Sequence, residues 1–172
     1  FMAGKHHGTQ NPFDRGFDRY FGLRDGACNY FNPGRQREGE GKPAQKHPNR
    51  AWCIDGKTYA PYTPPEKDFY TTDYFTNHAL EYLDSCKGDE RPFFLYLAYN
   101  APHTPIQPPA EWVARVKDRE PGIGDRRAKL VALIEHLDAG IGKVIDVLKQ
   151  TGLSDNTLVI FTSDNGGQLS VG

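Results

Sequence analysis

The chain has 172 residues, of which 37% are hydrophobic, and this is enough for one globular domain with a packed core. Its 18 glycines and 13 prolines indicate many loops, but they stay below the level typical of a disordered, low-complexity protein. A net charge of −1 lacks the basic excess that nucleic-acid binding requires, and no apolar run approaches the roughly 18 residues that span a bilayer. We therefore expect neither a nucleic-acid partner nor a membrane span.

The first half of the chain predicts little regular structure. Phe1–Ala3 has the composition of a strand end and leads directly into the polar residues Lys5, His6 and His7. Residues 33–68 are rich in proline and glycine and are predicted to be irregular. Within them, Trp52–Tyr59 contains an Asp-Gly pair, which indicates a short β-hairpin.

The middle of the chain alternates helical and strand patterns. Thr72 is predicted to cap a helix that runs to about Cys86, because apolar residues follow it at helical spacing. Phe93–Tyr99 is apolar on both faces, which is typical of a strand covered on both sides in a parallel sheet. Several prolines end that pattern, and a short helix is predicted around Ala110–Val116.

The strongest periodic signal predicts a long helix. Eight aliphatic side chains between Leu130 and Leu148 recur at steps of three and four, and Gly152 is placed to end the helix. Leu158–Phe161 then has the composition of a second buried strand. A strand, a long apolar helix and another strand predict an α/β fold with a parallel sheet.

Polar groups follow each of the three predicted strands directly. They are Lys5 and His7, the segment from Asn100 to His103, and the pair Asp164 and Asn165. Because ligands of open α/β sheets bind beyond the carboxyl ends of the strands, we expect these groups to converge at one edge.

Each of these groups has a structural interpretation as well as a functional one. Asp164 and Asn165 offer hard oxygen donors for Ca²⁺ or Mg²⁺, but Asp-Asn-Gly-Gly is also favourable in a turn, and spacing alone favours the turn. His103 is a candidate general acid or anion donor, although an isolated loop histidine is more often a surface residue. Lys5 and His7 point the same way only if their segment is extended.

Two other sets of residues are weaker candidates. Basic residues between Arg35 and Arg50 outnumber acidic ones, which favours a solvated loop over a site for an anionic substrate. Core packing is preferred to pocket lining for a group of five aromatic residues, namely Phe17, Tyr20, Phe21, Tyr30 and Phe31. The cysteines Cys28, Cys53 and Cys86 lack the short spacing of a metal site, and their odd number leaves the redox compartment open.

Taken together, these motifs resemble the sulfatase family of the alkaline-phosphatase-like superfamily. Gly4–Gly8 resembles the family's Gly-Lys-Trp-His-Leu-Gly, with His6 in the tryptophan position and the leucine missing. Gly16–Gly22 resembles the Gly-Phe-Asp-x-Phe-x-Gly that follows it, and Pro92–Pro105 is similar to the strand and loop that carry a histidine. Glu135–Gly166 is similar to the family's long helix and metal-binding strand, so the resemblance covers all but about residues 35–70.

The resemblance implies hydrolysis of a sulfate ester of an aryl or carbohydrate substrate, by a formylglycine nucleophile beside one Ca²⁺ ion. Asp164 and Asn165 would be metal ligands. Lys5 and His7 would hold the nucleophile and its sulfate, with His7 assisting breakdown of the sulfated intermediate, and His103 would bind sulfate and protonate the leaving oxygen. The implied partner is a sulfated small molecule or glycan, and the implied compartment is the periplasm or exterior of a bacterial cell.

The resemblance also implies a fold and a domain organisation. We expect residues 1–172 to be an interior portion of a single catalytic domain, a partial α/β/α sandwich with a mainly parallel sheet and an irregular insertion at 33–68. The formylglycine motif, Cys or Ser followed by x-Pro-x-Arg, does not occur in the chain. We therefore expect the nucleophile in a missing N-terminal part, with either Cys or Ser as its precursor, and we expect the fragment alone to be inactive.

Two alternative functions are compatible with the sequence. One is a phosphodiesterase or phosphatase of the same superfamily, although such enzymes usually bind two transition-type metals, whereas Asp164 and Asn165 better suit a single Ca²⁺ ion. The other is a catalytically inactive module that binds sulfated glycans. The sequence names neither the sulfated substrate nor the oligomeric state.

Overall fold

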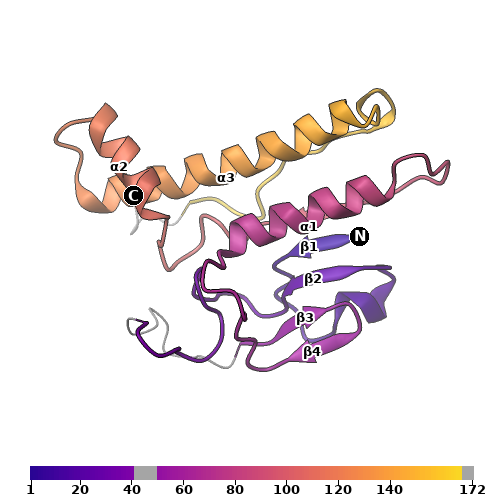
Figure 1. Cartoon of the computed structure of the whole chain (residues 1–172), viewed down its shortest axis with the longest axis horizontal. Coiled ribbons are helices and arrows are strands. Elements are labelled where there is room, and N and C mark those ends of the chain that lie inside the picture. Colours follow the sequence, from indigo (N-terminus) through magenta and orange to yellow (C-terminus); the bar gives the residue numbers. More distant parts are fainter. Residues whose placement is uncertain (41–49, 168–172) are drawn as a thin grey trace.

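A computed structural model describes residues 1–40 and 50–167 of the chain. One sheet has the strand order β4-β3-β2-β1-β5, and the long helices α1 and α3 run side by side along it (Figure 1). The strands are β1 (Met2–Gly4), β2 (Tyr20–Leu23), β3 (Trp52–Ile54), β4 (Lys57–Tyr59) and β5 (Tyr96–Ala98). The helices are α1 (Thr71–Ser85), α2 (Ala110–Arg119) and α3 (Asp125–Gln150), with short 3-10 helices η1 (Pro12–Arg15) and η2 (Ser154–Asn156).

The sheet combines parallel and antiparallel pairs. Strand β1 lies between the central strand β2 and the edge strand β5 and pairs in parallel with both, with Met2 opposite Tyr20 and Gly4 opposite Ala98. The predicted hairpin is confirmed: β3 and β4 pair antiparallel around Asp55, whose φ of 48° is the left-handed value that a tight turn needs. Because β3 also runs antiparallel to β2, the sheet is mixed rather than mainly parallel, while the predicted α/β class is confirmed.

The two faces of the sheet pack against different elements. Phe21 and Trp52 point towards α1 and pack with Phe75 of that helix, and the rings of Trp52 and Phe75 stack at 5.5 Å. Met2 and Tyr20 point to the opposite face, where they pack with Cys53 of the same sheet and with the half-buried Phe17. Successive side chains of a strand point to opposite faces of the sheet, so these strands bury side chains on both faces.

Helix α3 packs on α1 rather than on the centre of the sheet. At their crossing a Cβ on Gly140 would lie 2.8 Å from Oγ1 of Thr76, so only glycine lets the two helices approach this closely. The apolar stripe predicted for this helix is only partly buried: Leu133, Val144 and Leu148 are covered, whereas Ile134 is 45% exposed. The helix ends at Gln150 with Thr151 as its C-cap, and the predicted Gly152 follows the cap with a left-handed φ of 73°, where Leu153 N–H donates to the Leu148 carbonyl.

The predicted cap of α1 was wrong by two residues. The N-cap is Tyr70, and Thr71 and Thr72 are both inside the helix and buried. The backbone N–H of Thr71 donates to the Tyr30 carbonyl at 2.9 Å, and its hydroxyl lies 3.3 Å from Oδ1 of Asn100. Residues of distant loops, rather than a side-chain cap, therefore form the hydrogen bonds at the start of this helix.

The two predicted buried strands of the second half have different outcomes. Within Phe93–Tyr99, β5 pairs with β1 as expected, and Leu95 and Leu97 pack against α1 and α3. Its other face is open, with Phe94 69% and Tyr96 50% exposed, so the prediction of cover on both sides was wrong.

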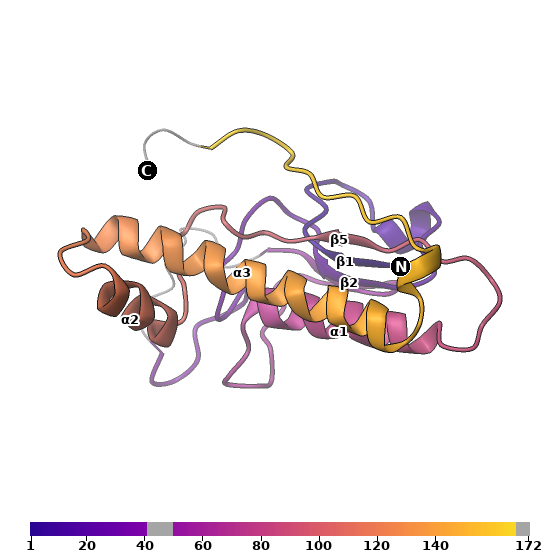
Figure 2. The ribbon, with the colours of Figure 1, turned by 90° about the horizontal axis from the view of Figure 1, so that it is seen from above.

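Leu158–Phe161 is not a strand, and the prediction that it is buried was wrong. Its four side chains are 55–85% exposed, and none of its residues pairs with a strand in the described sheet. The segment runs past the sheet in the same direction as β1 (Figure 2). Without a neighbouring backbone to hydrogen-bond, apolar composition alone does not produce a strand.

Candidate active site

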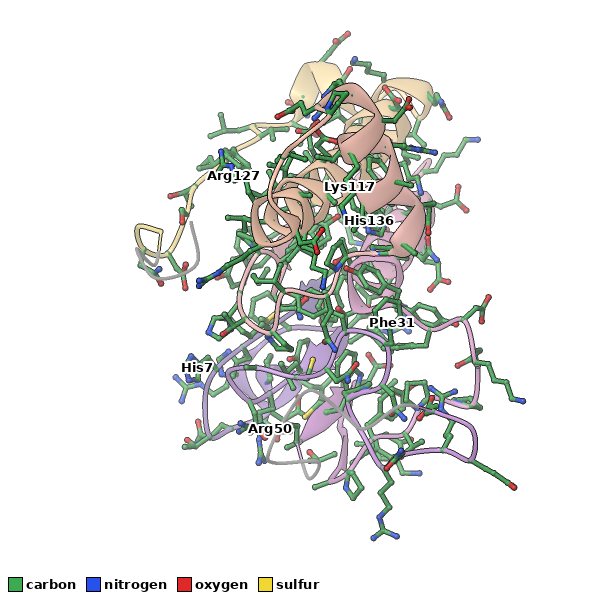
Figure 3. All side chains as sticks on the ribbon, turned by 90° about the vertical axis from the view of Figure 1, so that its left-hand side faces the viewer. His7, Phe31, Arg50, Lys117, Arg127 and His136 are labelled. Carbon is green, nitrogen blue, oxygen red and sulfur yellow. The ribbon has the colours of Figure 1, made fainter. Side chains whose placement is uncertain are left out.

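The carboxyl ends of β1, β2 and β5 meet at one end of the molecule. The loops that begin at Lys5 and at Tyr99 therefore leave the sheet at the same edge, as predicted. The backbone after β1 continues between its neighbours: Lys5 N–H donates to the Ala98 carbonyl at 2.6 Å, and His6 N–H donates to the Leu23 carbonyl at 2.8 Å. Lys5, Arg24 and Tyr99 therefore begin the three loops that form this edge. Figure 3 views the molecule from this end, where His7 and Arg50 lie close to the strand ends.

The segment from Lys5 to Gly8 bends as it leaves the sheet. His7 has a φ of 56°, so the segment is not extended there, and the condition under which Lys5 and His7 point the same way is not met. The imidazole of His7 lies against Gly26, where an added Cβ would come within 2.5 Å of Nε2. Glycine at position 26 thus leaves room for an exposed imidazole at the rim of the site.

His103 lies on the loop that follows β5, and hydrogen bonds from the side chain of Tyr30 fix the backbone of this loop. The hydroxyl of the buried Tyr30 lies 2.8 Å from the His103 carbonyl and 3.1 Å from the Asn100 carbonyl. The imidazole itself is exposed, with Nδ1 2.7 Å from the Thr104 carbonyl. If Nδ1 carries the proton and donates to that carbonyl, Nε2 faces outward and is free to accept or exchange a proton.

A buried layer supports this edge. The side-chain amide of Asn100 lies between Thr71 and the thiol of Cys28, 3.9 Å from Sγ. Burial raises the pKa of the Cys28 thiol to about 12, although the nearby positive charges of Arg50 and Lys5 act in the opposite direction. The thiol is therefore protonated at neutral pH, and its position is that of a packing residue rather than a nucleophile.

The candidate site also contains two charged side chains, Asp25 and Arg50, that the sequence did not identify as site residues. Asp25, in the loop after β2, accepts a hydrogen bond from the backbone of Ala51 at 2.7 Å and lies 3.9 Å from Nε of Arg24. Arg50 was assigned to a solvated loop, whereas its charge lies close enough to act on the Cys28 thiol. The sequence gives no local signal for this proximity, because Arg50 reaches the site only through the pairing of β2 with β3.

The third predicted group is not brought to the strand ends by the sheet. Asp164 and Asn165 are exposed, and their hydrogen bonds are local: Ser163 Oγ donates to the Asn165 carbonyl, and Asn165 Nδ2 donates to the Gly166 carbonyl. Across residues 1–40 and 50–167, no three His, Cys, Asp or Glu side chains are grouped as a metal site would require. These local bonds are those of a turn, and metal binding by the pair stays a prediction.

This end of the molecule can bind an anion and exchange protons. Lys5, Arg24 and Arg50 supply positive charge, and His7 and His103 supply exposed imidazoles. Fixed cations beside a proton donor are what hydrolysis of an anionic ester needs, because negative charge develops on the leaving oxygen. None of the helices described is long and apolar enough to cross a membrane.

The chain was compared with families and individual proteins of known sequence. A family model described as Sulfatase matches residues 2–172. The chain is 31% identical to the uncharacterized sulfatase YdeN of Escherichia coli over 90% of its length, and 30% identical to mouse arylsulfatase J over 94%. It spans 23% and 25% of those two proteins.

Solved structures extend the comparison to the fold. The crystal structure of Ps i-CgsB in complex with k-i-k-neocarrahexaose matches with a TM-score of 0.78 at 33% identity, covering 99% of this chain and 38% of that one. A putative sulfatase, yidJ from Bacteroides fragilis, matches with a TM-score of 0.63 at 18% identity, over 90% of this chain and 38% of that one. The second likeness concerns the fold alone.

Proposed function

Because the chain belongs to the sulfatase family, we propose that it forms part of the active site of a sulfuric ester hydrolase acting on a sulfated carbohydrate or aryl sulfate. The observation that carries this proposal is the convergence of two loops. Lys5 follows β1 and His103 follows β5, and these strands are parallel neighbours whose last residues are in register. A substrate at this edge is within reach of both side chains.

Each side chain has a proposed task. Lys5 holds the sulfate oxygens by charge, and His7, whose imidazole lies at the rim against Gly26, exchanges a proton there. His103 binds the sulfate and donates a proton to the leaving alcohol oxygen, which otherwise departs as an unstable alkoxide. Tyr30 acts through His103, because its hydroxyl fixes the loop backbone that carries the imidazole.

Asp164 and Asn165 are the residues that would hold a Ca²⁺ ion, which when bound draws electron density from the sulfuryl oxygens. Their carboxylate and carbonyl oxygens suit this ion, but two ligands are fewer than the six to eight it takes. The remaining ligands, and the formylglycine nucleophile, are proposed to come from parts of a longer protein outside these 172 residues. On this proposal the 172-residue chain alone does not turn over substrate.

The test is made on the full-length protein. We expect sulfate release from an aryl sulfate to be lost on calcium chelation and restored by added Ca²⁺. His103→Ala is expected to lower kcat by about 10²–10⁴, the usual contribution of a positioned general acid, and Lys57→Ala on the outer strand β4 serves as a control with no loss. Hydrolysis of aryl phosphate instead of aryl sulfate would overturn the proposal in favour of a phosphatase, and binding of a sulfated glycan without turnover would favour a binding module.

A further inference from the structure

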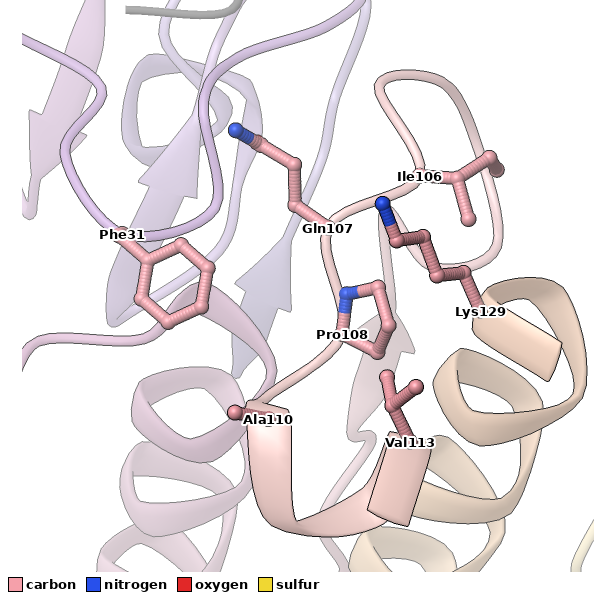
Figure 4. Close-up of a pocket in the computed structure, with 7 residues that line it drawn as sticks. All are labelled: Phe31, Ile106, Gln107, Pro108, Ala110, Val113 and Lys129. Atoms are coloured by element: carbon pink, nitrogen blue, oxygen red, sulfur yellow. The ribbon is translucent and has the colours of Figure 1, made fainter. Parts of the chain in front are cut away.

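A cavity of about 410 Å³ opens where the His103 loop meets α2 and α3. Its walls are mostly apolar, and two polar side chains enter it (Figure 4). The side chains that matter here are Phe31, Ile106, Gln107, Pro108, Val113 and Lys129. The cavity is open to solvent on one side, and its apolar walls with few polar groups can contact one face of a ligand.

The cavity is joined to the candidate active site by the chain itself. Ile106 and Pro108 lie on the same loop as His103, three and five residues further on. Tyr30, which fixes the His103 backbone through its hydroxyl, also donates its backbone N–H to Oε1 of Gln107 at 3.1 Å. Phe31 is the next residue, so one short segment of chain supports the proposed proton donor and also forms one wall of the cavity.

Phe31 is held rigidly although it is 42% exposed. Its backbone N–H donates to Oδ1 of Asn29 at 2.9 Å, and its ring lies 4.9 Å from the ring of Tyr70. Tyr70 is fixed in turn, because its hydroxyl donates to the Gln107 carbonyl at 3.0 Å. An exposed aromatic ring that is already ordered binds a ligand face at little cost in conformational entropy.

Lys129 gives the cavity its charge. It projects from α3 across the cavity from Phe31 (Figure 4), and it takes part in no ion pair among residues 1–40 and 50–167. Two cations of α2 differ in this respect, because Lys117 is paired with Asp125 and Arg119 with Glu120 and Glu135, whereas Arg126 and Arg127 of α3 resemble Lys129 and form no ion pair within the described residues. The charge of Lys129 acts on Asp125 one turn earlier in α3, but no carboxylate of the described residues pairs with its ammonium, which can reach an anionic group in the cavity.

We infer that this cavity, between Phe31 and Lys129, is a subsite for a neighbouring sugar unit of a sulfated oligosaccharide whose scissile sulfate lies beside His103. The inference rests on the proposed function and names its substrate class. The apolar face of the sugar ring packs on Phe31, the free amide N–H of Gln107 donates to a hydroxyl, and Lys129 pairs with a second sulfate. A small aryl sulfate has no neighbouring sugar unit to place in this cavity, so only the oligosaccharide is expected to use it.

The full-length protein is assayed for sulfate release from a sulfated carrageenan hexasaccharide and from an aryl sulfate. Phe31→Ala and Lys129→Ala are each expected to raise KM for the hexasaccharide about tenfold, the loss typical of one stacked ring or one charged contact, and to leave the aryl sulfate kinetics unchanged. Matched controls are Phe13→Ala, a ring of similar exposure on η1, and Lys143→Ala, about 21 Å further along α3.

An equal loss on both substrates would overturn the inference, because it would mean that the residues only support the His103 loop. Unchanged kinetics on both substrates would overturn it as well. If the wild-type protein releases sulfate from neither substrate, the proposed function fails separately, and calorimetric binding of the hexasaccharide tests the subsite. Weaker binding to both variants than to both controls then supports the subsite, and equal binding overturns it.

Discussion

The inner strands of the sheet and the segment Leu158–Phe161 are similarly apolar, and they differ in what lies beside them. Strand β1 has hydrogen-bonded neighbours on both sides and a helix over one face, and Met2 and Ala3 are fully buried. Leu158–Phe161 has no strand neighbour in the described part of the chain, and its side chains face outward. Burial of a strand is therefore a property of its neighbours as much as of its own residues.

The loops that carry the candidate site residues show the same difference between paired and unpaired segments. Lys5 and His103 belong to loops that leave the paired strands β1 and β5; the backbone of Lys5 is fixed by a hydrogen bond across the sheet to Ala98, and that of His103 by the hydroxyl of Tyr30. Asp164 and Asn165 follow the unpaired segment, and their hydrogen bonds reach only their immediate neighbours. The proposed sulfate-binding residues are held by contacts with distant parts of the chain, whereas the proposed calcium ligands are held only by local hydrogen bonds within the described residues.

The largest effect is expected at the centre of the paired region. Trp52 is fully buried, its ring stacks on Phe75 at 5.5 Å and on Tyr62 at 5.3 Å, and it meets Phe21 edge-on. Trp52→Ala is expected to lower the free energy of unfolding by about 3–5 kcal/mol, because it removes a large side chain and leaves a cavity. Urea denaturation of the chain measures this, and a loss below 1 kcal/mol would show that β3 is not part of the cooperative core.

A smaller effect is expected in the pH dependence of the free energy of unfolding, because the thiol of Cys28 is buried. The pKa of Cys28 is raised from 9.0 to about 12 by burial, so the native state holds this proton more tightly than the unfolded state. Its contribution to stability is complete below pH 9 and is lost as the pH rises from 9 towards 12, by at most about 1.4 kcal/mol per pH unit.

Comparison with Cys28→Ala isolates this contribution, because the buried tyrosines titrate in both proteins. The stability difference between wild type and variant, measured by urea denaturation at pH 8, 9 and 10, is expected to shift against the wild type above pH 9. A difference that stays constant over this range would mean that the thiol ionises freely in the folded protein.

Local signals in the sequence predicted the local elements well. The Asp55-Gly56 turn and the long helix followed by Gly152 both depend on residues close in the chain, and both formed as predicted. The start of α1 was misplaced because the backbone and hydroxyl of Thr71 are engaged by the distant Tyr30 and Asn100. No pattern within the helix itself carries that information.

The sequence predicts the candidate site only through those residues that directly follow a predicted strand. Lys5 and His103 were predicted because they follow strands, and the sheet brings their loops together, while their roles stay predictions. The supporting role of Tyr30 and the exposure of Phe31 depend on how a loop folds against residues some 70 positions away, so core packing was a reasonable but incomplete prediction for this pair. Tyr30 is indeed buried, whereas its neighbour lines a cavity.

The smallest effect is expected in the unpaired segment, and it tests the comparison directly. Phe161 is 82% exposed and Leu158 is 85% exposed, so replacing both by serine removes almost no buried surface. The double variant is expected to change the free energy of unfolding of the 172-residue chain by no more than about 0.5 kcal/mol, as is usual for surface positions. Urea denaturation beside Trp52→Ala provides the scale for this change.

Amide hydrogen exchange adds a second measurement at the same positions. The amides of residues 158–161 lack sheet partners and are expected to exchange at nearly the rate of an unfolded peptide, whereas those of β1 are protected up to the global free energy of unfolding. Protection of Leu158–Phe161, together with a stability loss in the double variant, would show that apolar composition at this position is sufficient to order a strand without a fixed neighbour. The expected result, fast exchange and no stability loss, would show that the neighbouring strand is the missing requirement.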